Sequence, residues 1–106
     1  MLHIYLAHAM AGLDNEEISN IRKKMEKYVR SRHAGCDIEI VNSYREEWED
    51  IPPVEALGMA LQLLAYSDIA YFGPGWDFSR GCGIEAMVCK QYNIPCCEIP
   101  EGFCDE

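Results

Sequence analysis

A chain of 106 residues has room for one domain with a modest core, and its 18 acidic against nine basic side chains give a net charge of −9. This balance repels a polyanion, which excludes nucleic acid as the expected partner, and no apolar run approaches the length of a membrane span. The start lacks a basic segment followed by an apolar signal core, so the chain is expected to be cytoplasmic.

The first half of the chain is predicted as a strand, a helix and a second strand. Leu2 to Ala7 is a short apolar run rich in β-formers, which indicates a central strand covered on both faces. An acidic cap at residues 14–17 opens an amphipathic helix that ends near Gly35, with its lysines and arginines on the solvated face. Residues 37–42 alternate polar and apolar side chains, which predicts a strand toward an edge of the sheet.

A polar irregular segment, residues 43–52, follows the second strand. Loops that a scaffold positions often carry binding groups, so this segment and the residue before it supply candidates for the rim of a site. The alternative is that its aromatic side chains pack on a neighbouring subunit. The candidates are Asn42, Ser43, Tyr44 and Trp48.

The second half of the chain continues the alternation of helix and strand. Pro53 opens a helix that runs to Tyr66 and is apolar almost all round, which indicates burial against the sheet and against a partner chain. Residues 68–72 and 94–99 are predicted strands. Between these strands, residues 81–93 form a predicted helix, with helical spacing at Ile84, Met87, Val88 and Tyr92.

Alternating strands and short crossover helices predict an α/β fold, a three-layer flavodoxin-like or Rossmann-like sandwich. Its parallel sheet has four or five strands, in the order 2-1-3-4. Residues 1–99 form the domain and residues 100–106 an acidic C-terminal tail. With this order, the loops at residues 7–12 and 73–81 face each other across the switch point of the sheet and form one pocket.

The loop after the third strand carries the most specific signal, Gly73-Pro-Gly-Trp-Asp-Phe-Ser-Arg-Gly-Cys-Gly-Ile-Glu85. Its glycines allow backbone to approach a ligand closely, and Ser79 is placed to cap the following helix. The first-turn amides together with Arg80 suit an anionic group. Glu85 lies near the same mouth, where a carboxylate serves as a nucleophile or general base; the alternative is an ordinary solvated glutamate.

The pattern Trp76-x-x-Ser79-Arg80-Gly81-x-x-x-Glu85, in a chain that opens Ile-Tyr-Leu-Ala-His-Ala-Met-Ala-Gly from residue 4, resembles the nucleoside 2-deoxyribosyltransferase-like superfamily. The closer resemblance is to its small phage and bacterial branch, the DUF4406 type. The resemblance covers residues 4–99 and is most specific from Ser79 to Glu85.

The resemblance implies an enzyme that cleaves or transfers the N-glycosidic bond of a nucleoside or nucleoside 5'-monophosphate. Glu85 matches the glutamate that attacks the anomeric carbon, and Tyr5 matches a first-strand tyrosine that orients it. Where transferases of unphosphorylated nucleosides have an aspartate, six residues before the nucleophile, this chain has Ser79. A serine there is similar to the monophosphate glycosidases, since a hydroxyl beside Arg80 attracts a phosphate that an aspartate would repel.

One departure from the family favours an alternative, the non-catalytic binding or sequestration of a nucleotide or nucleotide-derived signal in the same pocket. The family often has an aspartate eight residues before the acid that opens the third strand, and here that position is Ala60. Losing a general acid costs roughly 10²–10⁴-fold in rate. His8 is a candidate substitute, because imidazole titrates near neutrality, or else a structural residue whose ring bonds to backbone.

The candidate site therefore has a catalytic part and a ligand-binding part, and it implies no cofactor and no metal. Trp76 has two interpretations, stacking on a base or sugar, or anchoring a subunit interface. The family also implies a homo-oligomer, a dimer or higher. The catalytic candidates are Glu85, Tyr5 and His8; the ligand-binding candidates are Ala7, Gly12, Asn42, Gly75, Trp76, Ser79, Arg80, Gly81 and Gly83.

The six cysteines lie in ordinary α/β patterns without the paired spacing of a zinc site. We expect small buried hydrophobes or free thiols. Cys82 is the exception to consider, because a thiol in a first helical turn can have a lowered pKa. A cytidine-deaminase-like role is set aside, since the His-x-Glu and Cys-x-x-Cys pattern is missing.

Overall fold

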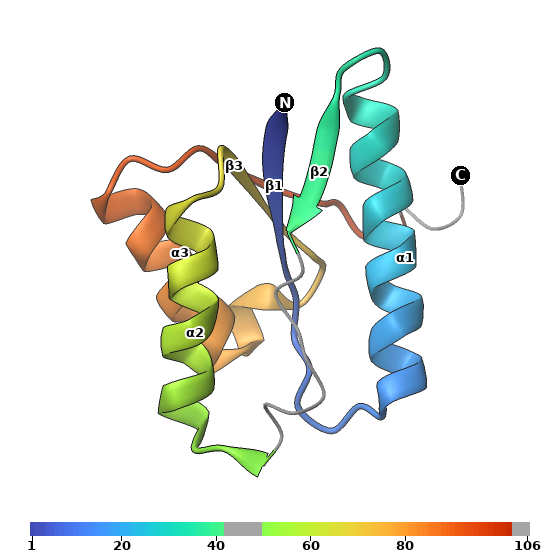
Figure 1. Cartoon of the computed structure of the whole chain (residues 1–106). Helices are drawn as coiled ribbons and strands as arrows, with labels where there is room; N and C mark the ends of the chain where they lie inside the picture. Colours follow the sequence, from blue (N-terminus) through green and yellow to red (C-terminus); the bar gives the residue numbers. More distant parts are fainter. Residues whose placement is uncertain (42–49, 103–106) are drawn as a thin grey trace.

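The computed structural model describes residues 1–41 and 50–102, which form a parallel four-stranded sheet between two layers of helices (Figure 1). Strands and helices alternate along the chain as the sequence predicted. The elements are β1 (Leu2–Ala7), α1 (Asn15–Arg32), β2 (Ile38–Val41), α2 (Pro53–Ala65), β3 (Ile69–Phe72), the short 3-10 helix η2 (Trp76–Phe78), α3 (Arg80–Gln91) and β4 (Cys96–Glu98).

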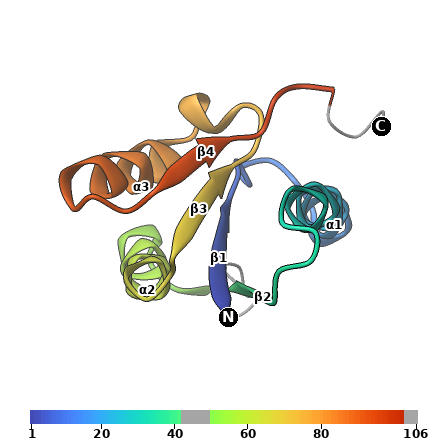
Figure 2. The same ribbon diagram turned by 90° about the horizontal axis from the view of Figure 1, so that it is seen from above.

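The strand order is β2-β1-β3-β4, which confirms the predicted order 2-1-3-4 with four strands. β1 pairs with β2 from Leu2 opposite Ile38, and with β3 from Ile4 opposite Ile69. β1 and β3 are therefore the central strands, and β2 is the edge strand that its alternating pattern predicted. Viewed from above, α1 covers one face of the sheet while α2 and α3 cover the other (Figure 2).

Local signals fix where the helices begin. The Asp14 carboxylate accepts from the Glu17 backbone N–H at 2.8 Å, and the Glu17 carboxylate accepts in return from the Asp14 N–H at 3.3 Å. This capping box satisfies two of the amides that a helix start leaves open. Pro53 occupies the first turn of α2, and the Ser79 hydroxyl caps α3 by accepting from the Cys82 N–H at 3.4 Å.

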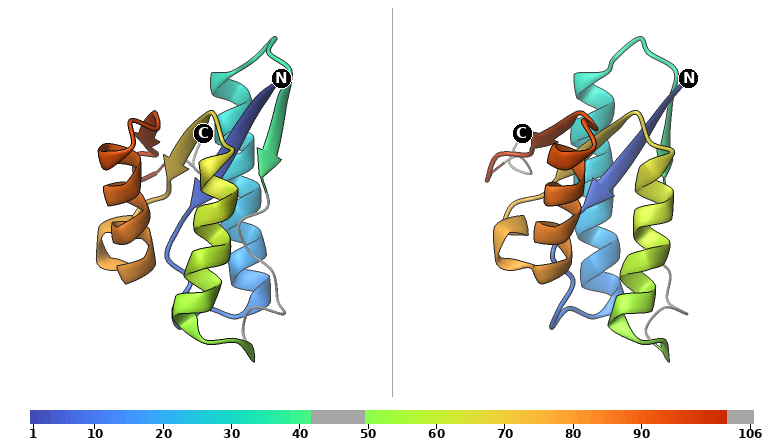
Figure 3. Two further views of the ribbon diagram at one scale, coloured as in Figure 1. Left: turned by 60° about the vertical axis from the view of Figure 1, so that its left-hand side comes forward. Right: turned by 90° about the vertical axis from the view of Figure 1, so that its left-hand side faces the viewer.

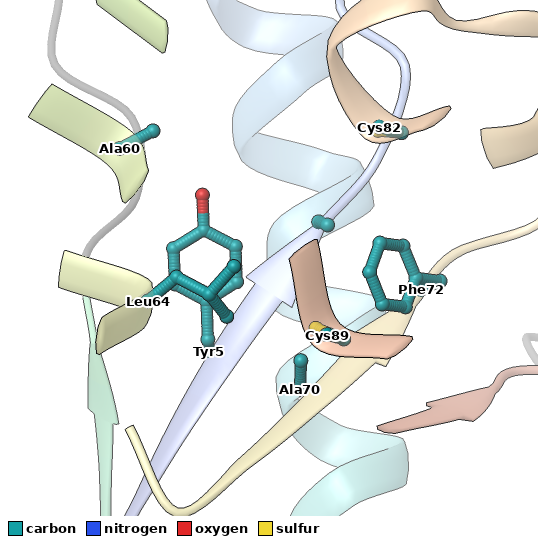
Figure 4. Close-up of a cluster of buried hydrophobic side chains, with 8 residues drawn as sticks. Tyr5, Ala60, Leu64, Ala70, Phe72, Cys82 and Cys89 are labelled. Carbon is teal, nitrogen blue, oxygen red and sulfur yellow. The ribbon is translucent and has the colours of Figure 1, made fainter. Parts of the chain in front are cut away.

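The two faces of the sheet have separate cores, because consecutive side chains of β1 point to opposite sides. Toward α1, Ile4 and Leu6 join a cluster that is completed by Met25, Val29, Tyr71 and Ile99. Toward α2 and α3, Tyr5 and Ala7 join smaller side chains (Figure 4). These are Ala60, Leu64, Ala70, Cys82 and Cys89, together with the ring of Phe72.

The side of α3 that is buried differs from the side that its apolar residues predicted. Ile84 and Met87 are exposed on its outer side, and the sheet-facing residues are Cys82, Glu85 and Cys89. Small side chains fit there because the rings of Tyr5 and Phe72 fill the space that the sheet offers to this helix. α2 and α3 lie side by side and run in the same direction (Figure 3). Within residues 1–41 and 50–102, no helix is both long and apolar enough to cross a membrane.

Candidate active site

A cavity of about 170 Å³ lies at the carboxyl end of β1, between α2 and α3. Its floor is β1 and the residues that follow it, one wall is the first half of α2, and the other is the start of α3. The Tyr5 ring points between the two helices from below (Figure 4). The lining residues are Tyr5, Leu6, Ala7, His8, Met10, Pro53, Ala56, Leu57, Ala60, Gly81 and Glu85.

Among the described residues that line this cavity, Glu85 is the one carboxylate, and its side chain is buried rather than solvated, at 7% exposure. The Tyr5 hydroxyl donates a hydrogen bond to Oε2 of Glu85. Burial raises the pKa of the Glu85 carboxyl, while the bond from Tyr5 lowers it in part. A carboxylate in this position has one oxygen held by the phenol and the other free to attack or to bind.

Tyr5 acts as a fixed proton donor in this pair. Burial raises the pKa of its phenol well above the usual value of 10.0, and the neighbouring Glu85 charge adds to that rise. The hydroxyl therefore stays protonated across the physiological range and orients the Glu85 carboxylate without exchanging its proton. The structure shows the contact between the two residues, while their roles as nucleophile and orienting group stay predictions.

His8 lies on the other side of the cavity floor and is 3% exposed. Its Nδ1 lies 3.2 Å from the carbonyl oxygen of Ala9, and its Nε2 lies 3.4 Å from Nη1 of Arg22. A carbonyl only accepts and a guanidinium only donates, so the ring carries its proton on Nδ1 and accepts at Nε2. Burial lowers the pKa of His8 to about 4, which makes the imidazole neutral at pH 7.

A neutral His8 argues against the role of general acid that the sequence suggested for it. With Nε2 accepting from Arg22 and Nδ1 held by the Ala9 carbonyl, the imidazole has no proton to give to a leaving group near neutrality. The backbone bond is the structural interpretation that the sequence left open. The chemistry of the cavity then rests on Glu85 and Tyr5.

The thiol of Cys82 is buried beneath the start of α3. Burial raises its pKa to about 11, and the Ser79 hydroxyl offsets only part of that rise. The lowered pKa considered for a thiol in a first helical turn is therefore wrong here, because loss of hydration outweighs the helix N-terminus. Cys82 serves as a small packing residue against the sheet.

Trp76 does not line the cavity. Its ring lies 5.3 Å from that of Phe72, and its indole N–H donates to the Glu98 carboxylate at 3.0 Å. These contacts fix the 73–79 loop to β3 and β4 of the same chain. The indole is therefore held by contacts within the chain, and its stacking on a base or sugar and its place in a subunit interface both stay predictions.

The structure brings five of the predicted site residues around the cavity: Tyr5, Ala7, His8, Gly81 and Glu85. The other described candidates lie in the loops and the first turn of α3 without lining it: Gly12, Gly75, Trp76, Ser79, Arg80 and Gly83. The two loops approach each other at Gly73, whose N–H donates to the Ala7 carbonyl at 2.8 Å. The pocket predicted between them differs, because of residues 73–81 only Gly81 lines the cavity and α2 supplies the opposite wall. A side chain at Gly73 would meet Met25 at 3.0 Å. Asn42, Ser43, Tyr44 and Trp48 lie outside the described residues.

Sequence analysis named Ala60 but missed the rest of the α2 wall and Arg22. Ala56 and Ala60 stand one turn apart and leave the volume that the cavity occupies. A pair of alanines four residues apart on an otherwise leucine-rich helix was the available signal. Arg22 falls four residues after the buried Ile18 and three before Met25, so its place on the inner side of α1 follows from the helical period.

A second hollow of about 440 Å³ runs along α1 and the edge strand β2, lined by Met1, Ile38, Ile40 and charged side chains of α1. This hollow is wide open to solvent, and among its described lining residues no carboxylate or nucleophile is buried. The smaller cavity at Glu85 is therefore the better candidate site. Among residues 1–41 and 50–102, no cluster of three His, Cys, Asp or Glu side chains is placed to hold a metal ion.

Comparisons with known proteins found no matching family model, no matching curated protein and no matching solved structure.

Proposed function

We propose that this protein cleaves or transfers the N-glycosidic bond of a nucleoside or nucleoside 5'-monophosphate, with Glu85 as the nucleophile. The observation that carries the proposal is the buried Glu85 carboxyl, held by the Tyr5 hydroxyl and facing a cavity at the carboxyl end of the sheet. Ligands of open parallel sheets bind at this end. The free thiols of the described residues fit a reducing cytoplasm.

In the proposed reaction, the free oxygen of Glu85 forms a bond to the anomeric carbon while the bond from that carbon to the base nitrogen breaks. The base leaves with the electron pair and takes a proton. Water then attacks the anomeric carbon of the glycosyl ester in a hydrolase and gives the free sugar, or an acceptor base attacks it in a transferase and gives a new nucleoside. The attacking group loses its proton to solvent as the ester bond breaks, which restores the Glu85 carboxylate. Tyr5 keeps its proton throughout and holds the carboxylate in place.

The size of the cavity supports a sugar-sized group at Glu85. A volume of about 170 Å³ is smaller than the ~300–1,000 Å³ usual for drug-sized ligands, so only part of a nucleotide lies inside. The start of α3 adjoins the cavity through Gly81, and its amides together with Arg80 suit a 5'-phosphate. Ser79 already caps this helix, which leaves Arg80 and the first-turn amides as the anion-binding groups.

A second candidate function, binding without turnover, is favoured by Ala60. This residue lines the cavity where a family enzyme has its second acid, and His8 is neutral with both ring nitrogens engaged. Nothing that lines the described cavity then protonates a departing base at neutral pH. Catalysis would rely on a base that leaves readily or on protonation from solvent.

The test is a chromatographic assay of base release and base exchange over a panel of nucleosides and 5'-monophosphates, with Glu85→Gln as control. The amide keeps an acceptor for the Tyr5 hydroxyl but cannot form the ester, so we expect turnover to fall by at least about 10³-fold. A slow substrate should leave a glycosyl adduct on the peptide that contains Glu85, detected by mass spectrometry.

Ala60→Asp separates the two candidate functions. If the missing acid limits an enzyme, this variant should raise turnover by roughly 10²-fold or more. If wild type and Ala60→Asp both leave every substrate intact while nucleotides raise the melting temperature, the binding function replaces the enzymatic one.

A further inference from the structure

Two of the free cysteines, Cys89 and Cys96, meet between the end of α3 and the start of β4. Cys89 lies on the inward side of α3, where it packs beside Ala70 (Figure 4). Cys96 is paired in register with the same Ala70 on the neighbouring strand. Burial raises the pKa of the Cys89 thiol to about 11, and a hydrogen bond with the Cys96 thiol adds to the rise, so the two thiols are in contact.

The alternation of side chains along β4 gives the direction of Cys96. Its neighbour Cys97 packs into the cluster on the α1 face of the sheet, so Cys96 and Glu98 point to the opposite face. Glu98 accepts there from the indole N–H of Trp76, which packs against the cluster toward α2 and α3. The Cys96 side chain therefore points to the side of the sheet on which Cys89 lies.

A short turn returns the chain from α3 to β4 and holds the two cysteines close together. The Ile94 N–H donates to the Cys89 carbonyl at 2.9 Å, and Asn93 takes the left-handed φ of 58° that is common where helices end. The Pro95 carbonyl then accepts from the Ala70 N–H at 2.9 Å, which fixes the start of β4 to the sheet. A covalent bond between the two sulfur atoms therefore needs only a small movement of the chain.

Solvent reaches the two thiols differently. β4 is an edge strand of the sheet and Cys96 is exposed on it, whereas Cys89 is 1% exposed. An accessible thiol beside a second cysteine is the arrangement of a redox-sensitive pair, in which the first thiol meets the oxidant and the second resolves the product.

We propose that a peroxide oxidises Cys96 and that Cys89 resolves the product to a reversible disulfide between α3 and β4. The Cys96 sulfur attacks one oxygen of hydrogen peroxide, the O–O bond breaks, and a sulfenic acid and a water molecule form. The Cys89 sulfur then bonds to the Cys96 sulfur and gives up its proton, which leaves with the sulfenic hydroxyl as a second water. The two thiols lose two electrons and the peroxide gains them, and a thiol reductant reverses the bond.

The contact between the thiols compensates for the weak acidity of Cys89. With a pKa of about 11, only about 10⁻⁴ of the Cys89 thiol is ionised at pH 7, and the thiolate is the form that attacks. A well-oriented group in the same molecule reaches an effective concentration of roughly 10⁵ M or more. Even about 10 M would let Cys89 react ahead of dissolved thiols at about 10⁻³ M, of which a few hundredths are ionised.

The test is peroxide treatment of the reduced full chain, then alkylation of the remaining thiols in denaturant, digestion with trypsin and tandem mass spectrometry without reductant. Cleavage after Lys90 separates Cys89 from Cys96, so a bond between them joins two peptides. We expect this joined species, about 2 Da lighter than the two reduced peptides, to form with hydrogen peroxide and to disappear with dithiothreitol. Cys36→Ser, which removes an exposed thiol elsewhere, should leave the bond unchanged.

Variants of the pair separate the two steps. Cys96→Ser changes an exposed position and should abolish the bond. In Cys89→Ala the oxidation should stop at the Cys96 sulfenic acid, and its labelling by dimedone should rise about 10-fold or more over wild type.

Three outcomes overturn the proposal: both thiols stay free in the treated wild type, Cys96 bonds to Cys97 instead, or the joined species persists in Cys96→Ser. None of these measurements uses a nucleoside. Their outcome is therefore independent of the chemistry proposed for Glu85.

Discussion

The two faces of the sheet have opposite constructions. Toward α1, large aliphatic and aromatic side chains fill the layer, and the outer surface of the helix is charged. Toward α2 and α3, alanines and cysteines leave a cavity, Glu85 is buried beside it, and the outer surface is apolar. The layer between the sheet and α1 is closely packed, whereas the layer between the sheet and the other two helices contains a cavity and a buried carboxylate.

This difference teaches how a chain of 106 residues can hold both a core and a site. A small domain has little apolar surface to spare, so a cavity and a buried carboxylate weaken it. Confining both to one side of the sheet leaves the other side free to be packed closely.

The largest effect on stability is expected from removing a packed side chain between the sheet and α1. Met25 has no exposed surface, so Met25→Ala should cost about 2–5 kcal/mol in the free energy of unfolding, measured with urea. Met87→Ala, the same change on the outer side of α3, should cost less than about 0.5 kcal/mol at concentrations where the chain is monomeric. Equal losses in the two variants would show that the two sides are packed alike.

The next effect concerns acid. Because burial lowers the pKa of His8 from 6.5 to about 4, the unfolded chain takes up a proton before the folded one as the pH falls. Stability should therefore decrease between these two values, by about 3 kcal/mol in all. His8→Gln removes this titration and leaves the other titrating groups in place. The difference in unfolding free energy between the two proteins, measured against pH, therefore reports the protonation of His8 beside Arg22. A constant difference across this range would contradict a neutral His8.

Glu85 should give a pH dependence of the opposite sign. Its pKa is raised above 4.5, so ionising the folded protein costs stability as the pH rises through that raised value. Glu85→Gln should therefore gain stability over wild type above this range and match it at lower pH. Urea unfolding of both proteins at several pH values measures the difference, and a gain that is the same at every pH would mean that the carboxyl is not buried.

The smallest effect separates the exposed cysteines from the buried ones. Cys36 and Cys96 are exposed, whereas Cys82 and Cys89 are buried and the pKa of each is raised to about 11. Native-state alkylation followed by peptide mass spectrometry should modify the first pair quickly and the second pair only after unfolding. Fast modification of Cys82 would mean that the start of α3 opens readily.

Much of the fold is determined by local sequence. The apolar run Leu2 to Ala7 predicts a doubly covered strand, and the residues around Asp14 and Ser79 predict where α1 and α3 begin. The alternation of elements then restricts the topology, because parallel strands need crossovers of one hand. Strand order and the meeting of the two loops followed from these signals.

The site depended on tertiary structure. Tyr5 and Glu85 are 80 residues apart, and their hydrogen bond exists because β1 and α3 meet at the same end of the sheet. The outward position of Ile84 and Met87 was also beyond the sequence, since a helical period shows which residues share a side but not which side is buried. The side that is buried is decided by the residues that the helix packs against. The rings of Tyr5 and Phe72 leave room for small side chains such as Cys82 and Cys89, so the larger Ile84 and Met87 face outward.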